Sequence, residues 1–238
     1  MLESLESQRR VGRAAWVMAW VGLVVGQLHA LSRFATADGR EDLDLPLTAA
    51  WAVPAADWLA PLLKWGDPDL VYVTYGKVWL PVFVAFTLCA LVVFARRRPT
   101  GVEKWVWRIA LTGYTVACLG VFLDYWTQWT GEYNVLFEVG WIVTVPGLLL
   151  TMLGSTALGA ILLMRGFRPV VPPLLLLAVI PLALGILQVT SMGSAALPIM
   201  FAFGLLGRRI SRASDVPVAP VTGHTSEDAS RLPAAADS

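Results

Sequence analysis

The chain has 238 residues and a formal net charge of +1, with 57% hydrophobic and 15% charged residues. Soluble domains contain roughly 45–50% apolar and about 25% charged residues, so this chain cannot bury its apolar surface without lipid. The composition therefore excludes a soluble enzyme and a disordered chain. The small net charge excludes a basic protein that binds nucleic acid.

Six stretches come close to the roughly 20 apolar residues that a helix needs to cross a bilayer. In chain order they cover residues 14–32, 71–95, 105–125, 139–164, 170–189 and 192–207. We therefore expect an all-α integral membrane helical bundle of six transmembrane helices, within residues 14–210. The last stretch is the shortest, which leaves open five spans followed by a re-entrant segment.

The basic residues indicate the orientation, because Lys and Arg in short loops favour the cytoplasmic side. With six spans and the N-terminus inside, 14 of the 18 basic residues lie on the cytoplasmic side. The four that remain outside are Arg33, Arg40, Lys64 and Lys77. An odd number of spans would place the arginines of residues 208–212 outside. We therefore predict a multi-pass plasma-membrane protein with both termini in the cytoplasm.

Two flanking segments are predicted on the cytoplasmic side. Residues 1–13 form an arm whose arginines precede the first apolar run, as in a signal peptide. No small-residue cleavage pattern follows near Ala30, so an uncleaved first helix is the preferred interpretation. Residues 211–238 are rich in Ala, Pro, Ser, Thr and Asp and have no apolar periodicity, which predicts a disordered tail.

The first outer loop, residues 33–70, combines acidic residues with tryptophans. Trp58, Leu62 and Trp65 recur at helical spacing, interrupted by a proline, as in a short helix lying in the membrane interface. A loop anchored in this way is the preferred interpretation, and a lid over an outward-facing cavity is the alternative.

Aromatic and small residues add two expectations about the spans. Trp105 and Trp107 are expected at the inner interface, where tryptophan is enriched. Gly22 and Gly26 have the spacing that lets two helices approach closely. Packing within one chain is the preferred interpretation of these glycines, while a homo-oligomer or another membrane partner stays open.

No motif assigns a reaction to the chain. There is no CxxC, HExxH, P-loop or GxSxG sequence, and Cys89 and Cys118 lie in separate predicted spans. We therefore predict no metal and no cofactor, and no residue is assigned as catalytic.

The candidate site consists of ionisable groups at membrane depth, which are rare and often functional. His29, Lys77, Asp124 and Glu138 all fall in the outer third of the predicted bilayer, and Tyr75 adds a hydroxyl there. We expect a polar pocket open to the outside, in which Lys77 pairs with Asp124 or Glu138. The alternative is that each group reaches the headgroup water separately.

Residues 152–169, MLGSTALGAILLMRGFRP, resemble a pattern in small multi-pass membrane proteins of high-GC Gram-positive bacteria. In that pattern a Gly-Ser pair, a later Gly, an Arg and a Pro end one span and begin the next; here they are Gly154, Ser155, Gly159, Arg165 and Pro169. The resemblance covers less than a tenth of the chain. It implies membrane location and helical architecture, and no functional residue.

Three functions remain as expectations. The first is a structural or interaction protein that binds membrane lipid or an apolar ligand through a pocket facing the outer leaflet. The second is a small transporter or channel subunit, which needs either oligomerisation or a continuous polar path. The third is an intramembrane enzyme acting on a lipid-like substrate, which needs two ionisable groups within hydrogen-bond reach of one point.

Overall fold

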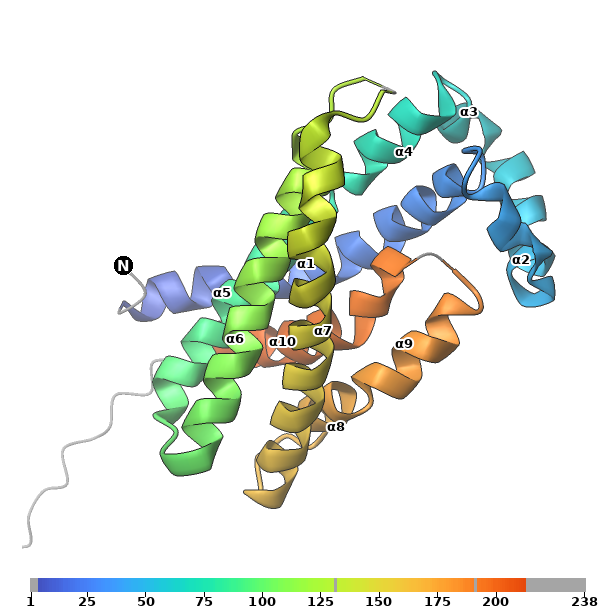
Figure 1. Ribbon diagram of the computed structural model, residues 1–238. Helices are drawn as coiled ribbons and strands as arrows, with labels where there is room; N and C mark the ends of the chain where they lie inside the picture. Colours follow the sequence, from blue (N-terminus) through green and yellow to red (C-terminus); the bar gives the residue numbers. More distant parts are fainter. Residues whose placement is uncertain (1–3, 131, 191, 213–238) are drawn as a thin grey trace, which may run out of the picture.

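The computed structural model describes residues 4–130, 132–190 and 192–212, and these residues form helices and no strand (Figure 1). Four helical segments in this part of the chain are long and apolar enough to cross a membrane: Leu5–Arg33, Pro68–Arg97, Gly101–Trp126 and Val135–Met164. The predicted all-α class is therefore confirmed, and these four helical segments fit the predicted membrane bundle in length and apolar composition. The other two expected spans, 170–189 and 192–207, are occupied by shorter helices. The expected disordered tail lies, from residue 213, outside the described residues.

The first half of the chain forms one long helix, an outer loop with short helices, and a broken helix. Its elements are α1 (Leu5–Arg33), η1 (Arg40–Asp44), α2 (Pro46–Trp58), α3 (Ala60–Leu63), α4 (Pro68–Gly76) and α5 (Trp79–Arg97). Because α1 begins at Leu5, residues 5–13 of the predicted arm are the first turns of this helix. Trp58, Leu62 and Trp65 of the outer loop are exposed, as expected for side chains in a membrane interface.

The second half consists of two long helices followed by shorter ones. Its elements are α6 (Gly101–Val121), the π-helical turn η2 (Phe122–Trp126), α7 (Val135–Met164), α8 (Val171–Leu177), α9 (Val179–Leu187), η3 (Met192–Ala196) and α10 (Leu197–Arg212). Side-chain caps start two of the long helices: Ser4 accepts from the amide of Ser7 in α1, and Asn134 accepts from the first turn of α7.

Proline explains where two of the predicted spans are interrupted. Pro81 has no N–H to donate to the carbonyl of Lys77, four residues earlier, and the chain breaks at Lys77 between α4 and α5. The Trp126 indole instead donates to that carbonyl at 2.9 Å. Pro181 likewise cannot donate to the carbonyl of Leu177, and α8 ends at this residue.

Contacts between helix ends gather the basic residues at one end of the molecule. We call residues 5–13, 96–104, 165–168 and 208–212 the basic end. Arg96 donates to Gln8 at 2.6 Å, which joins α5 to the start of α1. Arg97 pairs with Glu103 of α6, and its guanidinium lies 5.1 Å from the ring centre of Phe167.

A second set of contacts joins segments at the opposite end. We call residues 33–70, 126–135 and 188–190 the acidic end. Trp51 of α2 donates to the carbonyl of Val189 at 2.5 Å, and Thr48 donates to that of Gln188 at 3.1 Å. Thr190 donates to Gln27 of α1 at 3.3 Å. The connection after α9 thus lies beside the outer loop, on the side of the molecule away from the basic end.

Small residues allow the helices between these ends to pack closely. α1 and α10 run antiparallel with Gly12 against Gly207, and α6 meets α7 where Gly113 faces the backbone of Leu150. Gly22 faces Val82 and Met200 of the same chain. The prediction that such residues serve packing within one chain is therefore confirmed for Gly22.

The aromatic centre of the core corrects one prediction from the sequence. Trp107 is fully buried and packs against Phe94 and Phe203, so its ring faces the protein core and not the membrane interface. Trp105, two residues earlier, is 64% exposed and fits that expectation. Two residues are about 200° apart around a helix, so neighbouring tryptophans face opposite surroundings.

Candidate functional site

A cavity of about 520 Å³ lies toward the acidic end, enclosed by the outer loop, α1, α4, η2 and α7. Its polar wall includes His29, Arg33, Asp42, Tyr72, Asp124 and Thr144. Its apolar wall includes Phe83, Ala117, Val121, Leu148, Met152 and Ile199, most of them further along their helices from the acidic end. All charged residues of the lining lie in the part of the cavity toward the acidic end, here called its mouth, and the deeper part of the wall is apolar apart from Thr151.

His29 lies in the last two turns of α1 and is 1% exposed. The Trp79 indole donates to its Nδ1 at 3.1 Å, and an indole N–H is a donor only. Since Nδ1 accepts, Nε2 carries the ring proton. Nε2 is buried and has no hydrogen-bond partner among the described residues. The cavity wall thus contains a buried donor without an acceptor, which is costly unless a bound molecule supplies one.

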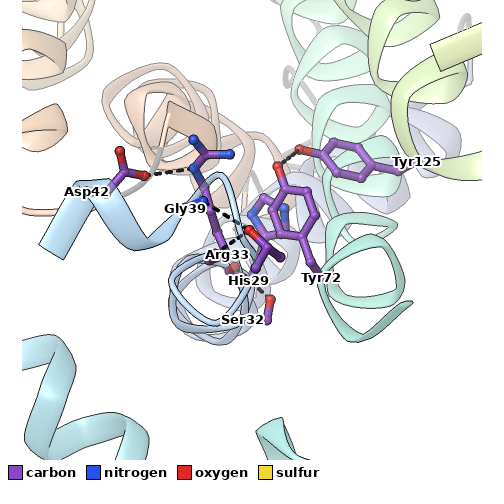
Figure 2. Close-up of polar contacts among 8 residues, drawn as sticks. His29, Ser32, Arg33, Gly39, Asp42, Tyr72 and Tyr125 are labelled. Carbon is purple, nitrogen blue, oxygen red and sulfur yellow. Dashed lines mark hydrogen bonds and ion pairs between the residues drawn. The ribbon is translucent and has the colours of Figure 1, made fainter. Parts of the chain in front are cut away.

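Two tyrosines enclose His29 on its other sides (Figure 2). The Tyr72 ring stacks on the imidazole with 4.6 Å between centroids, and the Tyr125 ring meets it edge-on at 5.2 Å. The two hydroxyls are hydrogen-bonded at 3.2 Å. The Tyr125 ring lies directly against Gly76 of α4, where any side chain would occupy its place. A glycine at 76 and the π-helical turn at 122–126 together position this ring.

Arg33 follows His29 by one helical turn and lines the same cavity. Its Nε donates to Asp42 at 2.8 Å, which ties η1 to the end of α1 (Figure 2). The turn between them is held by Thr36, whose hydroxyl donates to the carbonyl of Arg33 and accepts from the amide of Gly39. This turn brings the acidic loop to the cavity, where Asp38 and Asp42 line the wall, an arrangement that fits the alternative interpretation of the loop as a lid.

Asp124 occupies the wall opposite the loop, in the π-helical turn η2. The Thr144 hydroxyl of α7 lies 3.2 and 3.1 Å from its two carboxylate oxygens. Gly140, one turn earlier on α7, leaves the space for this carboxylate. The ion pairs of the described residues do not include Asp124. Its negative charge therefore has a hydroxyl donor but no cation.

Tyr133 belongs to the loop before α7 and adds an aromatic ring to the mouth. Its hydroxyl donates to Asp69 at 3.1 Å, and its ring stacks on Phe137 with 4.4 Å between centroids. Partial burial, together with the neighbouring Asp69 carboxylate, raises the pKa of Tyr133. The hydroxyl is therefore protonated at neutral pH and remains a donor.

The structure brings together two of the five predicted site residues. His29 and Asp124 line the cavity, whereas Lys77, Tyr75 and Glu138 do not. The predicted ion pair of Lys77 with a carboxylate does not form: its Nζ lies 3.7 Å from the ring centre of Trp129.

The other two predicted residues have structural surroundings of their own. Tyr75 donates to the carbonyl of Leu62 and so ties α4 to the end of α3. Glu138 is exposed in the first turn of α7, where a negative charge stabilises a helix N-terminus.

Sequence reasoning missed Arg33 and Thr144 as members of the site. Arg33 was assigned to the outer loop, yet its spacing of four from His29 places both on one face of α1. Thr144 has no charge to single it out, and nothing in the sequence pairs it with Asp124. No group of three His, Cys, Asp or Glu residues suited to a metal ion occurs in the part of the chain that the structure describes.

Comparisons with protein-family models, with curated proteins and with solved structures gave no match to this chain. The cavity is therefore the feature of this chain that indicates a function.

Proposed function

We propose that this protein is a multi-pass plasma-membrane protein that binds one amphipathic small molecule in the cavity at its acidic end. The observation that carries the proposal is the division of the cavity wall into a polar mouth and an apolar interior. Its volume of about 520 Å³ lies within the range of pockets that hold a small ligand, roughly 300–1,000 Å³. An apolar tail fits between Phe83, Leu148 and Met152, with the polar group near His29 and Asp124.

The proposal includes six membrane crossings with both termini in the cytoplasm. The contacts of Arg96 with Gln8 and of Arg97 with Phe167 support one shared end for the basic segments. The contact of Trp51 with Val189 supports a position of the α9–η3 connection beside the outer loop. In this arrangement α8 and α9 together make the fifth crossing and α10 the sixth. The positive-inside rule then places the basic end in the cytoplasm and the cavity toward the outer leaflet.

The core below the cavity favours binding over conduction. Phe86, Trp107, Tyr114 and Phe203 pack against one another between the cavity and the basic end. All four are essentially fully buried. A single chain that conducts needs a polar path through this region, and the aromatic cluster instead favours a cavity open at one end.

The experiment that tests this function fills the cavity and measures bound amphiphile. Leu148→Trp places a large ring in the cavity, since Leu148 lines it. The matched control is Leu149→Trp on the neighbouring position of α7, which is 55% exposed and does not line the cavity. Native mass spectrometry of the purified protein then counts amphiphiles that remain bound from the host membrane.

We expect about one amphiphile per chain in the unmodified protein and in Leu149→Trp, and a strong loss in Leu148→Trp. Circular dichroism of both variants serves to check that their helix content is unchanged. Equal occupancy in the two variants would show that the cavity is not the binding site. Absence of any bound amphiphile from the unmodified protein would also overturn the proposal.

A further inference from the structure

The charges on the cavity wall are predominantly negative. The charged side chains that line it are Arg33, Asp38, Asp42 and Asp124. Arg33 and Asp42 form an ion pair, which leaves Asp38 and Asp124 without a cation among the described residues. The outer segments of the chain are also acidic, because residues 33–95 and 110–138 together contain ten acidic and four basic residues. Such a surface attracts cations to its cavity.

Asp124 is the carboxylate best placed to meet a ligand inside the cavity. It lies in a helical turn rather than in the solvated loop, and the Thr144 hydroxyl fixes its orientation. A carboxylate taken partly out of water is costly unless an opposite charge accompanies it. Within the described residues no cation does so.

Aromatic rings border the same space and favour the same ligand charge. Tyr72, Tyr125, Tyr133 and Trp141 line the cavity near its mouth. The faces of such rings attract ammonium groups, and aromatic side chains combined with a carboxylate are a recurrent way to bind them. The structure already contains one such contact on its outer side, between Lys77 and Trp129.

The buried imidazole of His29 sets a second, independent requirement for the ligand, a hydrogen-bond acceptor. His29 Nε2–H is a donor with no acceptor, on a residue that is 1% exposed and lines the cavity. An alkylammonium group alone offers no acceptor to it. A ligand with a hydroxyl or carbonyl oxygen next to its ammonium offers an acceptor for this donor and a cation for Asp124 in one polar group.

From these observations we propose that the ligand is a single-chain cationic amphiphile whose ammonium pairs with Asp124 and whose adjacent oxygen accepts from His29 Nε2. This inference rests on the proposed function, since it specifies the polar group of the amphiphile that the cavity holds. The apolar chain then extends toward Leu148 and Met152.

The test compares three amphiphiles of equal chain length: dodecylamine, 1-amino-2-dodecanol and dodecanol. Each is added to the purified full-length protein in detergent micelles at the same mole fraction. Because a ligand that binds the folded state raises its melting temperature by mass action, the apparent affinity follows from the concentration dependence of the melting temperature. We expect the amino alcohol to bind most tightly, dodecylamine next and dodecanol least.

Two substitutions assign the selectivity to residues. Asp124→Asn keeps the shape and a partner for Thr144 but removes the charge, and we expect the affinity for dodecylamine to fall at least about tenfold. Its affinity for dodecanol should stay unchanged. The matched control, Glu138→Gln, removes an equal charge from the same side of the molecule outside the cavity and should retain the preference for the amine. His29→Phe should abolish the advantage of the amino alcohol over dodecylamine.

The outcomes separate this inference from the proposed function. If all three amphiphiles bind the unmodified protein equally but not Leu148→Trp, the cavity binds amphiphiles and the ammonium proposal is wrong. A similar loss of amine affinity in Asp124→Asn and Glu138→Gln would also overturn it, because the effect would then come from surface charge. If none of the three binds and native mass spectrometry finds no amphiphile, the proposed function itself fails. The comparison of the three amphiphiles on the unmodified protein tests the preference for an ammonium even where a variant does not fold.

Discussion

The packing of α6 against α7 can be tested at Gly113. An alanine Cβ at this position would lie 2.7 Å from the backbone carbon of Leu150 and 2.7 Å from the backbone nitrogen of Thr151. Nonbonded carbon atoms are most favourable at about 3.5–4.0 Å, so the contact is short by roughly 0.8 Å. Both neighbours are backbone atoms of a long helix and cannot rotate away. The two helices must therefore separate locally.

The magnitude follows from comparison with a glycine that has free space. Gly185 lies in α9, and a Cβ there meets no atom within 4 Å. Replacing glycine by alanine in a helix gains about 1 kcal/mol from backbone propensity at either position. The clash at Gly113 adds a cost of about 1–3 kcal/mol, as overpacking in a well-packed interior does. The difference between the two variants therefore reports the clash alone.

The assay is reversible unfolding in mixed micelles with increasing SDS, followed by circular dichroism. We expect Gly185→Ala to unfold at or slightly above the SDS fraction of the unmodified protein. Gly113→Ala should have a free energy of unfolding about 1–3 kcal/mol lower than that of Gly185→Ala. If the two variants are equally stable, α6 and α7 do not pack at the separation described, and the reasoning is refuted.

Three further predictions concern the site and the topology. Trp79→Phe removes a hydrogen bond between two buried side chains, the one that the indole donates to Nδ1 of His29. We expect this substitution to lower the free energy of unfolding by about 1–3 kcal/mol in the same assay. No change in stability would mean that this hydrogen bond does not form. Lys77→Met should leave amphiphile binding unchanged, because Lys77 does not line the cavity, and a binding defect would place it there. In a background without native cysteines, Gln188→Cys should react with a membrane-impermeant maleimide added to intact cells and Thr100→Cys should not. Protection of both positions would argue against six crossings.

The helical membrane class and the positions of two helix breaks could be predicted from the sequence. Apolar runs of about 20 residues fix the long helices, since a bilayer offers the backbone no other hydrogen-bond partners. Pro81 and Pro181 mark helix breaks for a local reason, the absence of a donor to the carbonyl four residues earlier. The four-residue spacing of His29 and Arg33 likewise predicts that both side chains lie on the same face of α1.

The composition of the cavity was only partly readable from the sequence, and the reason is geometric. A single sequence gives the depth of a residue along its helix, but not the rotation of that helix relative to its neighbours. His29, Lys77, Asp124 and Glu138 have similar predicted depths, yet only the first and third line the cavity. Glu138 lies one residue, or about 100°, from Phe137, which faces the cavity. Lys77 lies at the break between α4 and α5, where its direction depends on Trp129.

The sequence by itself determined that this is a helical membrane protein with its basic and acidic residues separated along the chain. Hydropathy and charge are properties of short segments. They determine which segments form spans and how these are oriented, without any contact between helices. The tertiary structure decided that Asp124 meets Thr144, that His29 keeps one donor without an acceptor, and that Trp107 lies in the core. These outcomes depend on close contacts between segments distant in the chain, and glycines such as Gly76 and Gly140 allow two of those contacts by leaving space for Tyr125 and Asp124.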